Sequence, residues 1–443
     1  MAMVPGDRSD AQSVAEAGSG PVRMVGVGSV LLLAGVQFVA FVDRAAPTVV
    51  AEPLKDAFSL TDGQIGTLQG PAFALTYAVA MLAAGHWARR VEPFRLMACC
   101  VALWTAGGIA FALADGYSML IVSRMVLGIG QAAFAPAALM VLGSAGVAMG
   151  RARAVSIFTT GSATGRSGGL FLGGAVLVAV TGGSVMGLEP WRAVCLALVL
   201  PNIALIAGLL VLSRRGGAAR AEPRAGLGQA ARWLLGEGRG ALGLVVAGSG
   251  CVISVQAAGA WMPSILHRSL GLPPAEAAVL VGLIVLAAAP IGHLSAGWIL
   301  GQRRMHGRSP GLLLAAGLGL SVIAALSLKG AVSLPMTVMA LAVLVASGGM
   351  AATTALIGLQ PLAPERLRGA VNTLYLASIS VVGVGFGPWI TGALSDRSGG
   401  GSAGLTNSLV QVVAAVAAVV IPLALLHGRR WAPAPQESAS QGG

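Results

Sequence analysis

Residues 26–50 read GVGSVLLLAGVQFVAFVDRAAPTVV and contain only two charged side chains, the adjacent Asp43 and Arg44. An apolar run of about 20 residues is long enough to cross the hydrocarbon core of a bilayer as an α-helix. Lipid offers no hydrogen bonds to the backbone, so such a run must satisfy its own backbone groups, as a helix does. We therefore predict a membrane-spanning helix that carries an aspartate and an arginine inside the membrane.

Eleven further apolar runs of similar length follow, separated by short polar or charged breaks. The 443 residues are 56% hydrophobic and only 10% charged, which is far more apolar than a soluble domain requires. The sequence therefore predicts an all-α polytopic membrane protein with twelve transmembrane helices. After the first, the expected spans lie at 64–86, 95–113, 118–141, 152–179, 191–213, 241–265, 276–300, 310–328, 332–358, 369–394 and 404–427.

Basic residues are concentrated in alternate loops. Of the 28 Lys and Arg residues, 16 lie in one set of loops and five in the other. A net charge of +12 is also typical of nucleic-acid-binding proteins, but this alternation is the positive-inside pattern of a membrane protein, so no nucleic-acid partner is expected. The crowded side is predicted to be cytoplasmic, in a bacterial inner membrane, with both termini on that side. The five on the opposite side are Lys55, Arg192, Arg268, Lys329 and Arg397.

The polar stretch 214–240 divides six expected spans from six and reads as a basic cytoplasmic linker. The segments that open spans five and eleven resemble each other, RARAV from Arg151 and RLRGAV from Arg366, at an offset of 215 residues. We predict two six-helix pseudo-symmetric halves, with the substrate site between them near the midplane. The expected units are a disordered tail at 1–24, an N-terminal bundle at 25–213, the linker, a C-terminal bundle at 241–427 and a disordered tail at 428–443.

Glycines recur at matching places in the two predicted halves. A four-residue ladder in span five and a Gly-Pro cluster in span eleven permit close backbone approach between helices. Tight packing explains them without any substrate, but helices packed this closely also suit an interface that rocks during transport. The gating candidates of this kind are Gly161, Gly165, Gly169, Gly383, Gly387 and Pro388.

Charged residues inside the spans predict an anionic substrate. Arg166 shares a helix face with Ser162, and Arg124 shares one with Gln131. Asp43 and Arg44 are neighbours whose side chains diverge by about 100°, so at most one of them is central to a cavity. An arginine in lipid is costly and should face protein or water. One aspartate against three arginines leaves a charge of +2, which an anion would neutralise.

The C-terminal half contains polar but not acidic residues inside its spans. Asn372 and Tyr375 lie on one face at i and i+3, and we expect them to shape the cavity together with Gln131 and Tyr77. His293 fits a packing or hydrogen-bonding role better than a proton relay. The cysteines read as small hydrophobes, and no nucleophile–base set, phosphate loop or metal cluster occurs, so we expect neither an enzyme nor a metal or other cofactor.

Seven segments together carry a family resemblance: Asp43-Arg44, LTDGQIGTLQGPAFALTYA from Leu60, RMVLGIGQAAFAPAAL from Arg124, RARAVSIFTTGSATGRSGGLFLGG from Arg151, EPWRAVCLALVLPN from Glu189, AWMPSILHRSLGL from Ala260 and GVGFGPWITGALSD from Gly383. In their order and spacing the chain resembles the major facilitator superfamily over essentially its whole length, and most of all its Spinster-like branch. The resemblance implies a secondary carrier that works by rocker-switch alternating access, often with proton coupling. Amphipathic lipids and organic anions are among the substrates it implies.

The chain departs from the family pattern at two places. After span two, Gly85-His-Trp-Ala-Arg89-Arg90 has Arg89 where a gating aspartate is expected, so we count Arg89 and Arg90 as candidates for an altered gate. In span four, Gln131 replaces the glutamate of the family-like pattern Arg-x-x-x-Gly-x-Gly-Glu. An amide cannot titrate, which leaves Asp43 as the acid able to couple transport to protons. The role of Arg166 has no family pattern behind it and rests on the physical argument alone.

Our leading hypothesis from the sequence is a monomeric carrier of an organic anion or anionic amphipath, lysolipids included. In this hypothesis Arg124 and Arg166 contact the anion and Asp43 is the coupling residue. The first alternative is efflux of hydrophobic drugs or metabolites, which would tolerate loss of Arg166. A second alternative is a membrane sensor that keeps the carrier fold and signals through its basic linker.

Overall fold

The computed structural model describes residues 26–143, 150–181, 187–214, 226–302, 310–331 and 333–431, without the side chains of 84–89 and 429–430. The predicted tail at 1–24 and most of that at 428–443 lie outside these ranges. Within them, twelve helical segments are long and apolar enough to cross a membrane, and they match the twelve predicted spans in order. The all-α prediction is confirmed.

The described residues of the N-terminal half form ten helices, because three of its six spans are divided in two and the short helix α3 lies between the first span and the second. For example, Gly70 separates α4 from α5, and a Cβ at Gly70 would lie 2.3 Å from the carbonyl oxygen of Gly385 in the other half. The bounds are α2 (Val27–Val49), α3 (Ala51–Phe58), α4 (Asp62–Gln69), α5 (Pro71–Arg90), α6 (Pro93–Ala112), α7 (Tyr117–Ala132), α8 (Phe134–Gly143), α9 (Arg151–Val180), α10 (Pro190–Val199) and α11 (Pro201–Arg214).

The C-terminal half has longer uninterrupted helices. The eleventh span of the chain contains a π-helical segment. The elements of this half are α12 (Leu227–Leu235), α13 (Arg239–Leu270), α14 (Pro274–Gly301), α15 (Gly311–Ser327), η2 (Leu328–Gly330), α16 (Leu334–Leu359), α17 (Glu365–Ser378), η3 (Ile379–Phe386), α18 (Gly387–Arg397), α19 (Gly401–His427) and η4 (Gly428–Trp431).

Two features differ from the sequence prediction. The linker region contains a helix, α12, whose Ala230 and Leu234 are buried against the C-terminal half. Trp431 falls in the stretch predicted as a disordered tail, but it is fully buried in the same core. Both differences have the same cause, because apolar side chains of these segments are buried against the end of the C-terminal bundle. The free energy gained by burying them exceeds the conformational entropy lost when the chain becomes ordered.

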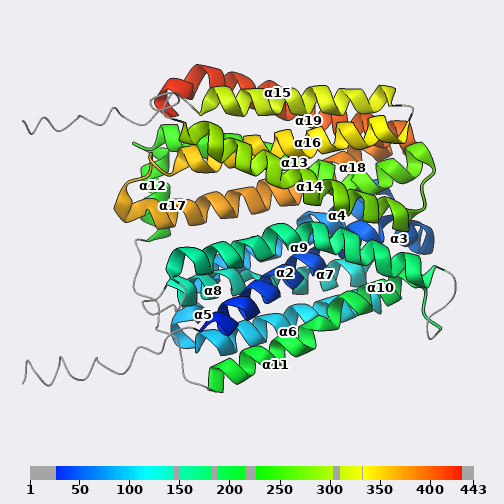
Figure 1. Cartoon of the computed structure of the whole chain (residues 1–443), viewed down its shortest axis with the longest axis horizontal. Helices are drawn as coiled ribbons and strands as arrows, with labels where there is room; N and C mark the ends of the chain where they lie inside the picture. Colours follow the sequence, from blue (N-terminus) through cyan, green and yellow to red (C-terminus); the bar gives the residue numbers. More distant parts are fainter. Residues whose placement is uncertain are drawn as a thin grey trace, which may run out of the picture.

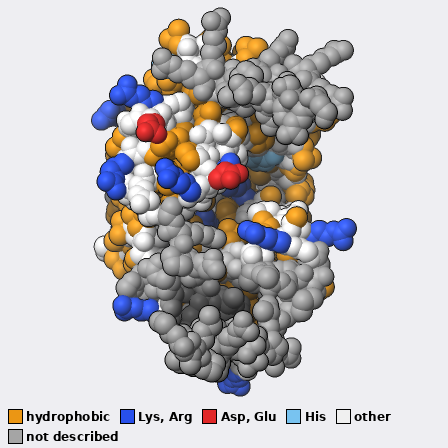
Figure 2. Space-filling model, turned by 90° about the vertical axis from the view of Figure 1, so that its left-hand side faces the viewer, with side chains coloured by type: hydrophobic (Ala, Val, Ile, Leu, Met, Phe, Trp, Pro, Cys, Tyr) orange, Lys and Arg blue, Asp and Glu red, His pale blue; other side chains and the backbone are white. Residues whose placement is uncertain are grey.

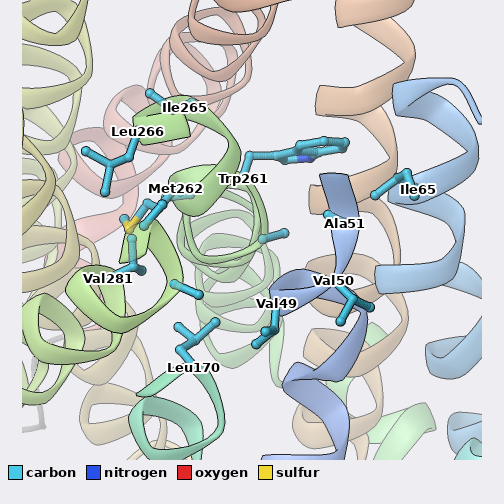
Figure 3. Packing of buried hydrophobic residues seen from close by; sticks show 14 of the residues in the cluster. Val49, Val50, Ala51, Ile65, Leu170, Trp261, Met262, Ile265, Leu266 and Val281 are labelled. Carbon is cyan, nitrogen blue, oxygen red and sulfur yellow. The ribbon is translucent and has the colours of Figure 1, made fainter. Parts of the chain in front are cut away.

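The two halves lie one above the other in Figure 1, with α2 and α5–α11 below and α12–α19 above. We call the left side of that view, where α12 lies, the linker end, and the right side, where α3 lies, the far end. Toward the linker end each half has its own main hydrophobic core, one around Phe134 and one around Tyr375, and the halves touch where Ala377 packs against a small cluster that includes Met81. At the far end a single core contains residues of both halves, such as Val49 and Trp261 (Figure 3). The halves are therefore joined most extensively at the far end.

The predicted glycine ladder packs within the N-terminal half. A Cβ at Gly161 would lie 2.4 Å from the carbonyl oxygen of Ala34 in α2, and one at Gly165 would lie 2.3 Å from that of Phe38. Gly169 meets α2 in the same way. These glycines therefore bring α9 against α2 and do not face the other half. Their positions support the packing explanation rather than a gating role.

The eleventh-span cluster is divided between two surfaces. Gly383 and Gly387 meet Val252 and Ile253 of α13, inside the C-terminal half. Pro388, in contrast, lies between the halves, because its carbonyl oxygen would be 2.6 Å from a Cβ at Gly66 of α4. Of this cluster, only Pro388 occupies a position that separates when the halves move apart.

Candidate functional site

Arg166 of α9 reaches across from one half to the other. Its Nη1 donates a 2.7 Å hydrogen bond to Oε1 of Gln256 in α13. The side chain remains exposed although it lies halfway along a membrane-length helix, and its guanidinium lies 5.5 Å from the ring centre of Phe41. An exposed side chain that touches both halves lines an internal space between them, which agrees with the expectation that this arginine avoids lipid.

Arg44 of α2 lies in an aromatic setting beside Arg166. Its guanidinium carbon is 4.6 Å from the ring centre of Phe41, 4.7 Å from that of Phe73 and 5.0 Å from that of Tyr77. Its Nε donates a 2.5 Å hydrogen bond to Oε1 of Gln131. Aromatic faces and amide oxygens stabilise a cation without neutralising it. Arg44 therefore keeps its positive charge available.

Asp43 points away from this pair, as the adjacent positions in one helix predict. It is 4% exposed, and its Oδ2 accepts a 2.9 Å hydrogen bond from Nδ2 of Asn202 in α11. Its Oδ1 is buried without a hydrogen-bond partner among the described residues. Asp43 and Arg124 also line one small cavity of about 20 Å³. In this conformation the one acid of the first span is thus inside the N-terminal half, not between the halves.

Arg124 and Gln131, predicted to form a polar stripe on span four, bind neighbouring helices. Arg124 is 2% exposed, and its Nε donates a 3.0 Å hydrogen bond to the carbonyl oxygen of Leu68 at the end of α4. Gln131 donates to the carbonyl oxygen of Ala40 at 3.0 Å while it accepts from Arg44. Here Arg124 braces α7 against α4, and Gln131 orients Arg44.

The predicted pair in the C-terminal half lies apart from the arginines. Asn372 is hydrogen-bonded to Gln360 at 3.1 Å. Tyr375 is 2% exposed, and its hydroxyl would be 2.6 Å from a Cβ at Gly248 of α13. Tyr375 is therefore a core residue of its own half in this conformation. Sharing a helix face did not bring the pair to the arginines, because Tyr375 packs against α13 and Asn372 is bonded to Gln360, just beyond the end of α16.

The altered gate predicted after span two consists of Arg89 and Arg90, and most of this segment lies among the residues whose side chains the structure does not describe. The side chain of Arg89 is among those not described, and Arg90 is exposed at the end of α5. Figure 2, which views the linker end, shows more Lys and Arg than Asp and Glu side chains on this face, with a recess between the two halves. This distribution is the one that the loop charges predict.

The structure adds site residues that the sequence analysis left unassigned. Gln37 donates a 2.8 Å hydrogen bond to Ser162, just beside Arg166 on α9. His293 of α14 is exposed and hydrogen-bonded to Thr353 of α16. A signal for part of this set was present, because positions 37, 41 and 44 follow the i, i+4, i+7 spacing of one helix face.

A second charged region closes the far end, and the sequence analysis missed it. Arg268 of α13 donates two hydrogen bonds to Asp62 of α4, at 2.8 and 2.9 Å, and also pairs with Glu52 of α3 at 2.8 Å. Asp62 is also paired with Lys55 and accepts a 2.7 Å hydrogen bond from Ser395. The second span was predicted to begin at 64, which left Asp62 in a loop, whereas α4 begins at Asp62 and buries it.

Backbone contacts reinforce this closure. The carboxylate of Asp396 in α18 accepts 2.8 Å hydrogen bonds from the N–H groups of Asp62 and Gly63, at the start of α4. Within the C-terminal half, Trp261 donates a 2.9 Å hydrogen bond to the carbonyl oxygen of Pro388, which holds α18 in place beside α4. A Cβ at Gly392 would lie 2.3 Å from the carbonyl oxygen of Asp62. The helices α4 and α18 therefore meet backbone to backbone.

Comparison with known proteins agrees with this architecture. The model of the Major Facilitator Superfamily matches residues 33–388. A relative from Mycolicibacterium smegmatis described as an MFS-type efflux pump is 28% identical over 416 residues, which cover 90% of this chain and 91% of that protein. The probable sulfoacetate transporter SauU of Cupriavidus necator is 31% identical over 101 residues, 23% of each chain.

Among solved structures, a bacterial homologue of the human lysosomal transporter Spinster, in an inward-facing and unoccupied conformation, has a TM-score of 0.80. It is 23% identical and covers 94% of this chain and 100% of its own, so the likeness is one of fold. The family match over most of the sequence, together with twelve membrane-length helices in two halves, shows that the chain belongs to the Major Facilitator Superfamily.

Proposed function

We propose that this transporter is a secondary carrier of an organic anion, with Arg166 and Arg44 as the residues that bind the anionic group. The observation behind this proposal is that the hydrogen-bond partners of both guanidiniums are uncharged. Arg166 is bonded to Gln256 and Arg44 to Gln131, both neutral amides, and no described carboxylate pairs with either arginine. The one nearby acid, Asp43, is turned toward Asn202.

Charge balance supports the same proposal. A cation held inside a membrane protein is expensive unless it meets an opposite charge or water. A carboxylate or sulfonate placed between the halves would meet that need, and a guanidinium can bind either group in bidentate fashion. The local similarity to a protein named as a probable sulfoacetate transporter fits an anionic cargo. Whether the cargo is a small acid or an anionic amphipath such as a lysolipid is part of the test below.

The conformation suggests how the site is reached. The halves share one core at the far end but have separate cores at the linker end. The similar Spinster homologue was solved in an inward-facing conformation. We therefore propose that the linker end is cytoplasmic and that this structure is the inward-facing state. The anion would displace the contact between Arg166 and Gln256 and let the halves close on it, as rocker-switch access requires.

Asp43 is the proposed coupling residue. Its buried Oδ1 lacks a described partner, and the neighbouring arginine, Arg124, shares its small cavity. Gln131 cannot take or release a proton, so proton coupling through span four would have to involve Asp43. Measurement of anion flux with and without a pH gradient, in wild type and in Asp43→Asn, tests this assignment.

A second candidate function is efflux of neutral hydrophobic compounds. It is favoured by the similarity over 90% of this chain to a protein described as an efflux pump, and by the aromatic rings of Phe41, Phe73 and Tyr77 around Arg44. In that function the aromatic rings would bind the substrate and Arg166 would be dispensable.

The deciding experiment measures thermal stability of the detergent-purified protein with a panel of carboxylates, sulfonates, anionic lysolipids and neutral drugs. Binding to the folded state raises Tm with ligand concentration. The comparison uses wild type, Arg166→Ala and Arg153→Ala, since Arg153 is an exposed arginine at the start of the same helix. We expect an anion to stabilise wild type and Arg153→Ala but not Arg166→Ala. Stabilisation by neutral compounds alone, or an unchanged response of Arg166→Ala, would reject the anion proposal in favour of efflux.

A further inference from the structure

A cavity separate from the central site lies at the far end, between α3, α9 and α10 of one half and the start of α14 of the other. Its volume is about 620 Å³. Apolar side chains form most of its wall, among them Leu177, Val178 and Trp191. This volume is within the range of sites that hold drug-sized molecules, about 300–1,000 Å³.

The charged groups on this wall are all acidic. The lining includes Asp56 of α3, Glu189 at the start of α10 and Glu276 in the first turn of α14, and it includes no lysine or arginine. Glu189 is already engaged, since it accepts hydrogen bonds from Trp191 at 2.9 Å and from Arg192 at 3.1 Å. Asp56 and Glu276 are exposed and take part in no described hydrogen bond or ion pair of their side chains. The carboxyl end of α9, whose carbonyls carry partial negative charge, also borders the cavity.

The electrostatic character of this cavity is therefore opposite to that of the central site. An anion that binds Arg166 would be repelled here, so the cavity is not a second position for the proposed cargo. A zwitterionic phospholipid fits poorly as well, because it would bring a phosphate beside the carboxylates. A molecule with an apolar body and a single cationic group matches both the wall and the charges.

We propose that this far-end cavity is a binding site for an amphipathic cation. The ammonium group lies between Asp56 and Glu276, and the apolar body packs against Trp191, Leu177 and Val178. Trp191 is 2% exposed and packed into the far-end core, with the guanidinium of Arg192 4.4 Å from its ring centre, so only a small part of the indole reaches the cavity wall.

Occupancy of this site favours one conformation. The two free carboxylates belong to different halves, Asp56 to the N-terminal half and Glu276 to the C-terminal half. A cation that bridges them holds the far end closed, because it binds that arrangement better than one in which the halves have separated there. The cation therefore slows the transport cycle without competing for the central arginines.

The test uses phenylbutyl-trimethylammonium, a soluble amphipathic cation, and its uncharged tert-butyl isostere. Binding is followed by thermal stability and by titration calorimetry in a neutral maltoside detergent. The variants are the double change Asp56→Asn with Glu276→Gln, and Ala57→Trp, which fills the cavity from an exposed position while keeping the carboxylates. Asp115→Asn is the control, since Asp115 is an exposed acid near the far end that does not line the cavity.

We expect the cation to stabilise wild type and Asp115→Asn, with affinity about fivefold lower in the double variant because two partly exposed charge pairs are lost. Ala57→Trp should bind more weakly than wild type as well. The proposal is overturned if the uncharged isostere binds as tightly as the cation, which indicates partition into an apolar surface. It is also overturned if the double variant or Ala57→Trp binds like wild type. Both variants alter exposed positions, and their unliganded Tm values check that they fold. None of these outcomes depends on whether the central cargo is an anion.

Discussion

The far-end closure and the central site both contain charged side chains near the boundary between the two halves, but they differ in whether those charges have a partner of opposite sign. At the far end, Asp62 meets Arg268 and Lys55, and its side chain is 1% exposed. In the central site, the hydrogen-bond and ring partners of Arg166 and Arg44 among the described residues are amides and aromatic rings. The buried carboxylate of Asp62 is thus paired without any ligand, whereas the two guanidiniums of the central site have no carboxylate partner among the described residues.

This difference explains how one fold can rest in a single conformation and still respond to a substrate. A buried ion pair whose members have exchanged water for each other resists separation, since either charge alone is costly inside a protein. The central arginines have no such partner among the described residues, and in the proposed function they gain one when an anion binds. Under that proposal the closure sets the resting state, and anion binding supplies the free energy that changes it.

The largest effect is expected from Arg268→Ala. Removal of this guanidinium leaves Asp62 and Glu52 without their main partner, and loss of one member of a buried pair costs about 3–5 kcal/mol. We expect a lower Tm and a far end that opens more often. The measurement is Tm together with labelling of a cysteine introduced near Trp261, in a background without the four native cysteines.

Arg397→Ala is the matched control for that experiment, because Arg397 is an exposed arginine at the end of α18 near the same closure. It should leave both readouts unchanged. Equal labelling of Arg268→Ala and wild type would mean that the apolar core in Figure 3, not the ion pairs, holds the far end closed.

A pair of glycine variants separates closure from folding. Gly392→Ala places a Cβ 2.3 Å from the backbone of Asp62 in the other half, and Gly165→Ala places one 2.3 Å from the backbone of Phe38 in the same half. Crowding of this kind costs about 1–3 kcal/mol. We expect Gly392→Ala to increase far-end labelling with little loss of Tm, and Gly165→Ala to lower Tm without changing the labelling.

Gly259→Ala is the control for both glycine variants, since nothing lies within 4 Å of the added Cβ in the middle of α13. It should be neutral or slightly stabilising, because alanine favours a helix over glycine. If Gly165→Ala also increases far-end labelling, then α9 moves against α2 during the transport cycle. That result would support the gating role that the sequence predicted for this glycine ladder.

A carboxylate placed in the central site should make it resemble the far end. Gln131→Glu puts an acid where an amide now accepts from Arg44 at 2.5 Å. The new pair neutralises one guanidinium, so we expect about tenfold weaker anion binding, equivalent to roughly 1.4 kcal/mol. Gln131→Met is the uncharged comparison. Titration calorimetry with the best anion of the panel gives the affinities, and equal weakening in both variants would assign the effect to the lost hydrogen bond rather than to charge.

Apolar length and loop charge were sufficient to predict twelve helices in two halves, because both properties are local in sequence. A local signal for part of the central site was also present, because Gln37, Phe41 and Arg44 share one helix face, but the sequence analysis did not assign these residues to a site. Contacts between the halves could not be predicted in this way. Arg268 lies 206 positions from Asp62, and no local pattern links them. The burial of Asp62 was also hidden, because a charged residue at the end of an apolar run is usually read as the start of a loop.

The smallest effect is expected from Gln256→Leu, which removes the neutral partner of Arg166. The hydrogen bond between them is exposed to the internal space, so breaking it costs little once water replaces the amide. An anion no longer has to displace Gln256, and we expect its affinity to rise about threefold, or roughly 0.6 kcal/mol. Gln360→Leu is the control, because Gln360 is a bonded amide of the same half whose partner is Asn372. Weaker binding in Gln256→Leu would show that the amide contacts the anion itself, and the central site would then use both halves to bind its cargo as the far end uses both halves to close.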